Sequence, residues 1–89
     1  MLEELTNELL EKKGFTNQTI IAIEELSELQ KELCKALRDK LNINNLIEEI
    51  ADVEIMLFQI KKIFNIKKEQ IDCVKIKNIE RTKNKLKNN

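Results

Sequence analysis

Hydrophobic positions recur with a helical period along almost the whole chain. In residues 2–12, Leu2, Leu5 and Leu9 are spaced by three and four, which is typical of one face of an amphipathic helix. Gly14 follows and is the only glycine in the sequence, and a glycine just after a helical pattern commonly ends the helix. We therefore predict a short helix over 2–12 that stops at Gly14.

Two long helical patterns and a basic one follow this short helix. The first long helix is expected to begin at a cap provided by Thr16 or Asn17 and to run to about Asp39. Three asparagines then mark a turn and a new cap: Asn42, Asn44 and Asn45. The remaining helices are expected over about 45–64 and 67–86, with a break at Asn65.

The composition supports a helical chain that forms a single domain. Of the 89 residues, 42% are hydrophobic and 36% are charged, with one Gly and no Pro. This mixture favours helices, and the lack of Gly and Pro removes most of the turns that a β-rich fold requires. We predict one all-α domain over 1–89, an antiparallel helical bundle with about four helices per chain.

The helix expected over 45–64 is apolar around most of its circumference. Its main stripe repeats at spacings of four and three: Leu46, Ile50, Val53, Leu57, Ile60 and Phe64. Such a helix is buried on several sides, and an 89-residue chain with four helices does not easily surround it. We therefore predict a homodimer or homotetramer that completes the bundle, with this helix near the interface.

The first long helix, which is expected to end near Asp39, also has an apolar side and a polar side. Its apolar side is expected in the core: Ile23, Leu26, Leu29, Leu33 and Leu37. Its opposite side is expected in solvent: Glu24, Lys31, Lys35 and Arg38. Glu25, Glu28 and Glu32 lie on the flank of the apolar arc.

Several classes of protein and site are excluded by what the sequence lacks. No apolar run is long enough to span a bilayer, and the first residues are acidic, so we expect neither a membrane span nor a signal peptide. Cys34 and Cys73 are far apart, so we expect reduced thiols packed as small hydrophobes in a cytoplasmic protein. With no His and only two Cys, we do not expect a zinc site.

The net charge of zero hides an uneven distribution of charge. Residues 1–65 contain 8 Lys/Arg and 13 Asp/Glu, a net charge of −5, whereas residues 66–89 contain 8 and 3, a net charge of +5. This pattern fits an internal pairing of charge or a cation site beside an anion site. For most of the lysines, solvation on a helix surface is the simpler interpretation.

Two acidic pairs interrupt the apolar surfaces of the two long helices. Glu49 and Asp52 lie in or beside the apolar arc of one helix, and Glu25 and Glu28 are neighbours on the other. If these helices form a hairpin, the four carboxylates converge, and a hard divalent cation such as Mg²⁺ compensates their repulsion. Two simpler readings stay open, because glutamate pairs are often surface ion pairs and Asp52 can be a structural acid.

The acidic pairs resemble a known sequence signature. The segments "EELSE" (24–28) and "EIAD" (49–52) resemble the EExxE…ExxD motif of the MazG-like all-α nucleoside triphosphate pyrophosphohydrolases. The apolar positions of "LIEEIADVEIML" also fit the second motif helix of that family, and "GFTNQTIIAIEELSEL" resembles its entry loop and first motif helix. The resemblance covers roughly residues 8–85.

This resemblance implies a function and a metal site. Glu25, Glu28, Glu49 and Asp52 would hold Mg²⁺, with Mn²⁺ as a substitute, and would act in catalysis through the metal. The substrate would be a nucleoside triphosphate, and the (d)NTP would be cleaved to (d)NMP and pyrophosphate. Relatives include enzymes that remove noncanonical nucleotides from the nucleotide pool, and the sequence does not indicate which base is preferred.

The resemblance also implies phosphate contacts from the last helix. Arg81 matches the arginine expected there, while Asn78 replaces a residue that is often Lys in relatives, and Lys77 is adjacent. Gln18 resembles a family position near the pocket, although packing at the start of the helix explains it equally well. The departure at Asn78 leaves a second reading open, a non-catalytic helical module that binds nucleotide or a partner.

A third reading is a nucleic-acid-binding protein that uses the basic C-terminal segment. It predicts affinity that falls steeply with salt. The chain has only three aromatic residues, and its acids are embedded in apolar surfaces, so the sequence argues against nucleic acid as a partner.

Overall fold

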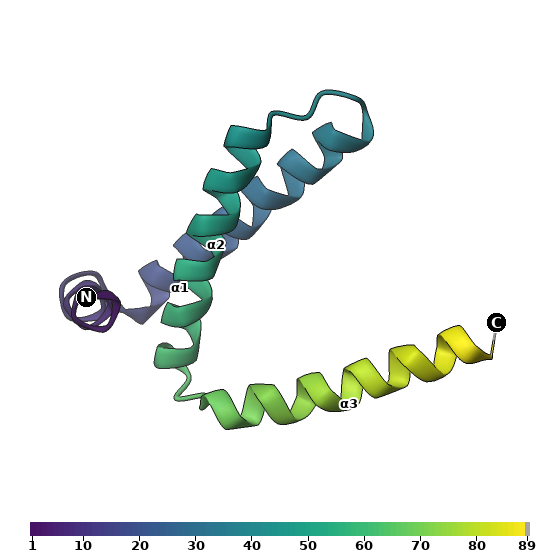
Figure 1. The fold of residues 1–89 in the computed structure, drawn as a ribbon. Coiled ribbons are helices and arrows are strands. Elements are labelled where there is room, and N and C mark those ends of the chain that lie inside the picture. The colour runs from purple at the N-terminus through teal and green to yellow at the C-terminus, as the bar shows by residue number, and fades with distance from the viewer. Residues whose placement is uncertain (89) are drawn as a thin grey trace.

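A computed structural model describes residues 1–88 as three helices joined by two short bends (Figure 1). They are α1 (Leu2–Leu37), α2 (Ile43–Ile63) and α3 (Lys68–Lys87). The prediction of an all-α chain is confirmed. The first two of the four predicted helices correspond to the two segments of α1, which meet at a kink at Gly14. No helix in the described part of the chain is both long and apolar enough to cross a membrane.

Gly14 produces a kink inside α1 at the predicted boundary. Its backbone leaves the helical region, with φ 83° and ψ 161°, and glycine adopts a positive φ without the clash that a Cβ causes. The segment before the kink runs in a different direction from the rest of α1 (Figure 1). Neither Thr16 nor Asn17 caps the second segment in the described chain; the Asn17 amide instead donates to Gln18 Oε1 at 3.3 Å.

Asparagines and a glutamine define the other helix ends. The Asn42 side chain accepts a hydrogen bond from the backbone N–H of Asn45 at 3.1 Å, so α2 begins at Ile43, two residues before the predicted start. Asn65 has a φ of 54° and ends α2 where a break was predicted. The Gln70 side chain accepts from the N–H of Lys67 at 2.8 Å and fixes the start of α3.

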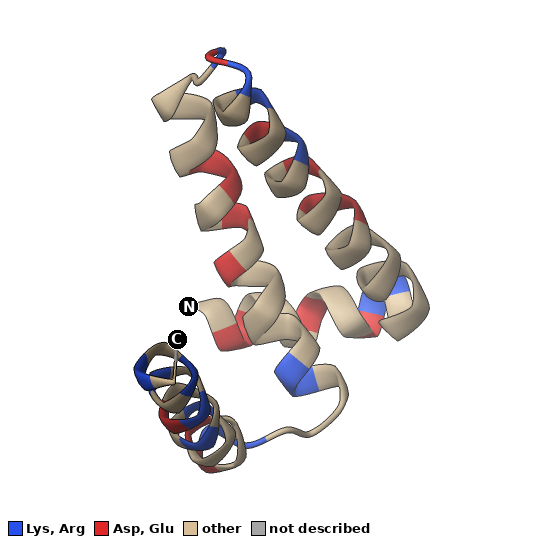
Figure 2. Ribbon diagram, turned by 90° about the vertical axis from the view of Figure 1, so that its right-hand side faces the viewer, with Lys and Arg blue, Asp and Glu red and all other residues tan. Residues whose placement is uncertain are grey.

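Helices α1 and α2 lie side by side and run in opposite directions, whereas α3 extends away from both (Figure 1). In the described residues, α1 and α2 are the only helices that pack against each other. The acidic residues are concentrated on this pair, and α3 carries many of the basic ones (Figure 2). The acidic and the basic parts of the sequence therefore lie in different parts of the structure.

The two packed helices bury few of the apolar residues that were predicted for the core. The buried residues of the pair are Thr6, Gln18, Ala22 and Glu32 on α1 and Val53, Met56 and Gln59 on α2. Most of the predicted core is exposed within the chain: Ile23, Leu26, Leu33, Leu37, Ile50, Leu57 and Phe64. The reason is that one partner helix covers only one face, and α3 does not pack against either helix. Val53 is the member of the predicted stripe that is buried, at 7% exposed.

The cysteines follow the prediction in one respect only. Cys34 and Cys73 are both free thiols, as predicted, but both are exposed rather than packed as small hydrophobes.

Because the apolar arcs are wide and the buried core is small, each chain has extensive uncovered apolar surface.

A hydrogen bond between two glutamines crosses the centre of the helix pair. Gln18 Nε2 donates to Gln59 Oε1 at 2.9 Å, and each residue is only 2% exposed. A buried amide that keeps its partner costs little, whereas one that loses its partner bears the full cost of desolvation.

We expect Gln59→Leu to lower the free energy of unfolding by about 1–3 kcal/mol, because the buried Gln18 amide then has no acceptor. The double variant Gln18→Leu/Gln59→Leu should recover most of this loss, since no unpaired polar group remains. Urea unfolding followed by circular dichroism measures both. Equal stability of the single variant and the wild-type chain would contradict this role of the bond.

Candidate metal centre

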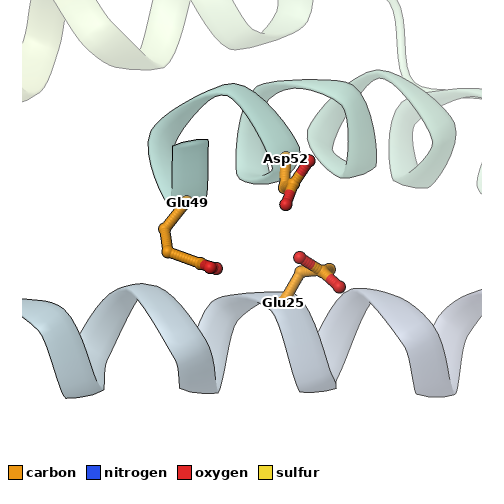
Figure 3. Close-up of side chains that lie close together, drawn as sticks. All are labelled: Glu25, Glu49 and Asp52. Carbon is orange, nitrogen blue, oxygen red and sulfur yellow. The ribbon is translucent and has the colours of Figure 1, made fainter. Parts of the chain in front are cut away.

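Three carboxylates converge between α1 and α2 (Figure 3). Glu25 comes from α1, and Glu49 and Asp52 come from successive turns of α2. One carboxylate oxygen from each residue lies within 4.8 Å of the others, and all three residues are half-buried. The sequence analysis predicted that these residues of the two long helices would meet.

The glutamine pair and the acids belong to one register of the antiparallel helices. Glu25 lies seven residues after Gln18 on α1, and Asp52 lies seven residues before Gln59 on α2. Seven residues correspond to about two turns of an α-helix, so both acids return to the packed face. The bond between the two glutamines therefore aligns Glu25 opposite Asp52.

The electrostatics of the three acids are unfavourable without a cation. Burial raises the pKa of Glu25, and the Asp52 charge and a hydrogen bond with Asp52 raise that pKa further. Burial also raises the pKa of Glu49, with additional repulsion from Asp52 and Glu28. In residues 1–88, no lysine or arginine forms an ion pair with any of the three.

The donor set fits a hard divalent cation. Glu49 Oε2 is buried and has no hydrogen-bond partner in the described chain. A carboxylate oxygen in that position requires a proton or a cation, and three carboxylates that face one another supply the oxygen ligands preferred by Mg²⁺. The residues present therefore suit the cation that the sequence predicted.

The other predicted ligand, Glu28, is placed differently. It is exposed and lies outside the group of three, although its charge contributes to the raised pKa values of Glu25 and Glu49. Glu48 and Glu54 are exposed, as expected for residues that point away from the site. The structure thus brings together three of the four predicted metal ligands.

The predicted substrate-binding residues are not gathered at the acids within one chain. Lys77, Asn78 and Arg81 are exposed on α3, which packs against neither α1 nor α2. The Gln18 side chain is used in its buried bond to Gln59, so the packing interpretation describes it better than pocket lining. A groove of about 570 Å³ lies at the bend between α2 and α3, and none of the three acids lines it.

Two polar residues are buried that the sequence analysis did not place in the core. Glu32 and Gln59 are 6% and 2% exposed. Each lies seven residues after a predicted ligand, Glu25 or Asp52, so the same helical spacing would have placed both on the packed face. Lys35, predicted to be solvated, is half-buried and lies 3.2 Å from Glu32.

Comparison of this chain with protein-family models, with curated proteins and with solved structures found no match.

The raised pKa values of Glu25 and Glu49 predict how stability depends on pH in the absence of metal. A carboxyl group whose pKa is higher in the folded state favours folding at low pH and loses that contribution as pH rises through the folded value. We therefore expect the melting temperature to fall between the ordinary glutamate value of 4.5 and pH 7. The pKa values of Glu3 and Asp72 are lowered, so these residues lose their contribution to stability only as the pH falls below this range.

Thermal unfolding followed by circular dichroism across this pH range, with and without Mg²⁺, measures the effect. Mg²⁺ should remove much of the fall, because it replaces the proton between the acids. Glu49→Gln should flatten the metal-free curve, and a curve unchanged by this substitution would contradict the assignment.

Proposed function

We propose that this chain is a Mg²⁺-dependent nucleoside triphosphate pyrophosphohydrolase, which cleaves a (d)NTP to the (d)NMP and pyrophosphate. The observation that carries the proposal is the convergence of Glu25, Glu49 and Asp52, with a buried oxygen of Glu49 that has no partner. The resemblance of "EELSE" and "EIAD" to the MazG-like signature supports the same conclusion.

The proposed roles follow from the chemistry of the side chains. Glu25, Glu49 and Asp52 would hold the cation, and the exposed Glu28 would add negative charge near it. When bound, Mg²⁺ neutralises phosphate charge and lowers the pKa of a coordinated water. The half-buried acids fix the position of the cation, because positioning and electrostatic stabilisation supply most of the catalysis in phosphoryl transfer.

The phosphate chain requires positive charge that one copy of the chain does not bring to the acids. Arg81 and Lys77 lie on α3, away from α1 and α2. We propose that the functional unit is a homodimer or homotetramer, in which α3 of one copy lies against the acidic helices of another. The charges of +5 and −5 on the two parts of the chain support this arrangement, as do the exposed apolar residues of α1 and α2.

A second candidate function is a non-catalytic module of the same fold that binds nucleotide or a partner. The observation that favours it is Asn78, which provides no positive charge where relatives of the family often have Lys. This module would bind a nucleotide in the presence of Mg²⁺ and leave it intact.

The activity is tested by incubation of the chain with a panel of (d)NTPs and Mg²⁺, with pyrophosphate and nucleoside monophosphate measured as products. We expect turnover of at least one nucleotide, and Glu49→Gln should lower it by about 100-fold or more, as for loss of one electrostatic contact to a reacting group. Glu54→Gln, an exposed position on the same helix, is the matched control and should retain activity. Absence of hydrolysis with every nucleotide refutes the enzyme, and Mg²⁺-dependent binding without turnover selects the second candidate.

The oligomer is tested by size-exclusion chromatography with light scattering. At micromolar concentration we expect two or four times the chain mass of 10.5 kDa. Leu57→Glu places a charge on the exposed apolar face of α2 and should shift the population to monomer, whereas Glu54→Gln should not. A wild-type chain that elutes only as a monomer refutes this part of the proposal.

A further inference from the structure

The groove at the bend between α2 and α3 is separate from the three converging acids. Its walls come from the last turns of α2, from the bend and from the first turns of α3, and Glu3 of α1 also lines it. Its volume of about 570 Å³ lies within the range of small-molecule sites, which is about 300–1,000 Å³. The size of the groove therefore suits one small ligand.

The lining of the groove has more positive than negative charge. Four lysines and two acidic residues line it, which leaves an excess of +2. Both acidic residues already have a lysine partner, because Lys62 pairs with Glu3 and Lys68 pairs with Asp72, each at 2.7 Å. The excess therefore belongs to the other two lysines.

These two lysines, Lys61 and Lys75, come from different helices. Lys61 is half-buried near the end of α2, and Lys75 is exposed two turns after the start of α3. Within residues 1–88, neither lysine forms an ion pair with a carboxylate. An anion in the groove would therefore be attracted from two walls at once.

Apolar side chains line the same groove. Phe58 and Ile71 are half-buried, and Ile66 lies at the bend itself. Removal of such surface from water is favourable, so a ligand with an apolar body gains more here than a bare inorganic anion. The groove thus combines an apolar surface with two uncompensated positive charges.

We propose that this groove binds a phosphate monoester with a compact apolar body. Such a group carries a charge of about −1.5 to −2 at pH 7, which matches the excess of +2, whereas a carboxylate carries a single charge. Lys61 and Lys75 bind the phosphate oxygens as point charges, and the apolar body lies against Phe58, Ile66 and Ile71. The site uses neither a metal nor the acids between α1 and α2, so it is independent of the proposed function.

The test is a titration of the ¹⁵N-labelled full chain with phenyl phosphate, followed through the amide chemical shifts. Ionic strength is held constant and divalent cations are left out, so that no ligand is held at the acids through a metal. We expect shifts that saturate at Asn65, Ile66 and Ile71, which line the groove. Absence of a saturable shift at these residues would overturn the inference.

Substitutions identify the groups that hold the phosphate. Lys61→Gln and Lys75→Gln should each weaken binding by about threefold to tenfold, as expected for loss of one partly exposed charge contact. Lys85→Gln, at an exposed position of α3 outside the groove, is the matched control and should bind like the wild type. Glu49→Gln should also leave the affinity unchanged. A double variant Lys61→Gln/Lys75→Gln that binds as tightly as the wild type would overturn the inference.

Further probes test the chemistry of the ligand. Benzoate has an aromatic body with one charge, and inorganic phosphate has the charge without the body, so both should bind more weakly than phenyl phosphate. Inorganic phosphate or benzoate that binds as tightly as phenyl phosphate would overturn the inference. Hexyl phosphate then distinguishes the two kinds of body, because tighter binding than phenyl phosphate assigns an alkyl chain and weaker binding assigns an aromatic ring.

Discussion

The structure depends on one interface, the contact between α1 and α2, and this interface is polar at its centre. Ala22, Val53 and Met56 supply its buried apolar surface, and the Gln18–Gln59 bond fixes its register. Because buried amides must find partners, a slip of one residue along either helix would leave both glutamines unpaired. The same register determines which carboxylates face one another, so the folding of the pair and the assembly of the acidic site are one event.

This arrangement explains the apparent conflict between the apolar content of the chain and its small core. Each long helix has a wide apolar arc and a narrower face that carries amides and acids. Within a single chain the helices use the narrower face, which leaves the leucine- and isoleucine-rich arcs exposed. If the two helices packed through their apolar arcs, the acids would lie apart. Burial of these arcs by further copies of the chain would instead leave the acidic site intact.

Much of this structure follows from local rules, and the remainder does not. Helix ends were predictable from Gly14, Asn42 and Asn65, because the conformation of each depends on its own neighbourhood. The meeting of Glu25 with Glu49 and Asp52 was predictable from helical spacing together with the acidic motif. The choice of the packed face was not, because it depends on how many helices one chain brings together. For that reason the position of Glu28 outside the group of three, the separation of α3 from the acids and the burial of Glu32 did not follow from the sequence.

The separation of charge between the acidic helix pair and α3 makes the molecule a strong electric dipole without net charge. Two neutral copies do not repel each other at long range, yet they attract when the positive end of one faces the negative end of another. At physiological ionic strength, screening limits this attraction to about 8 Å, so it orients copies only as they touch. The bend at Asn65, which directs α3 away from α2, therefore sets the direction of the dipole.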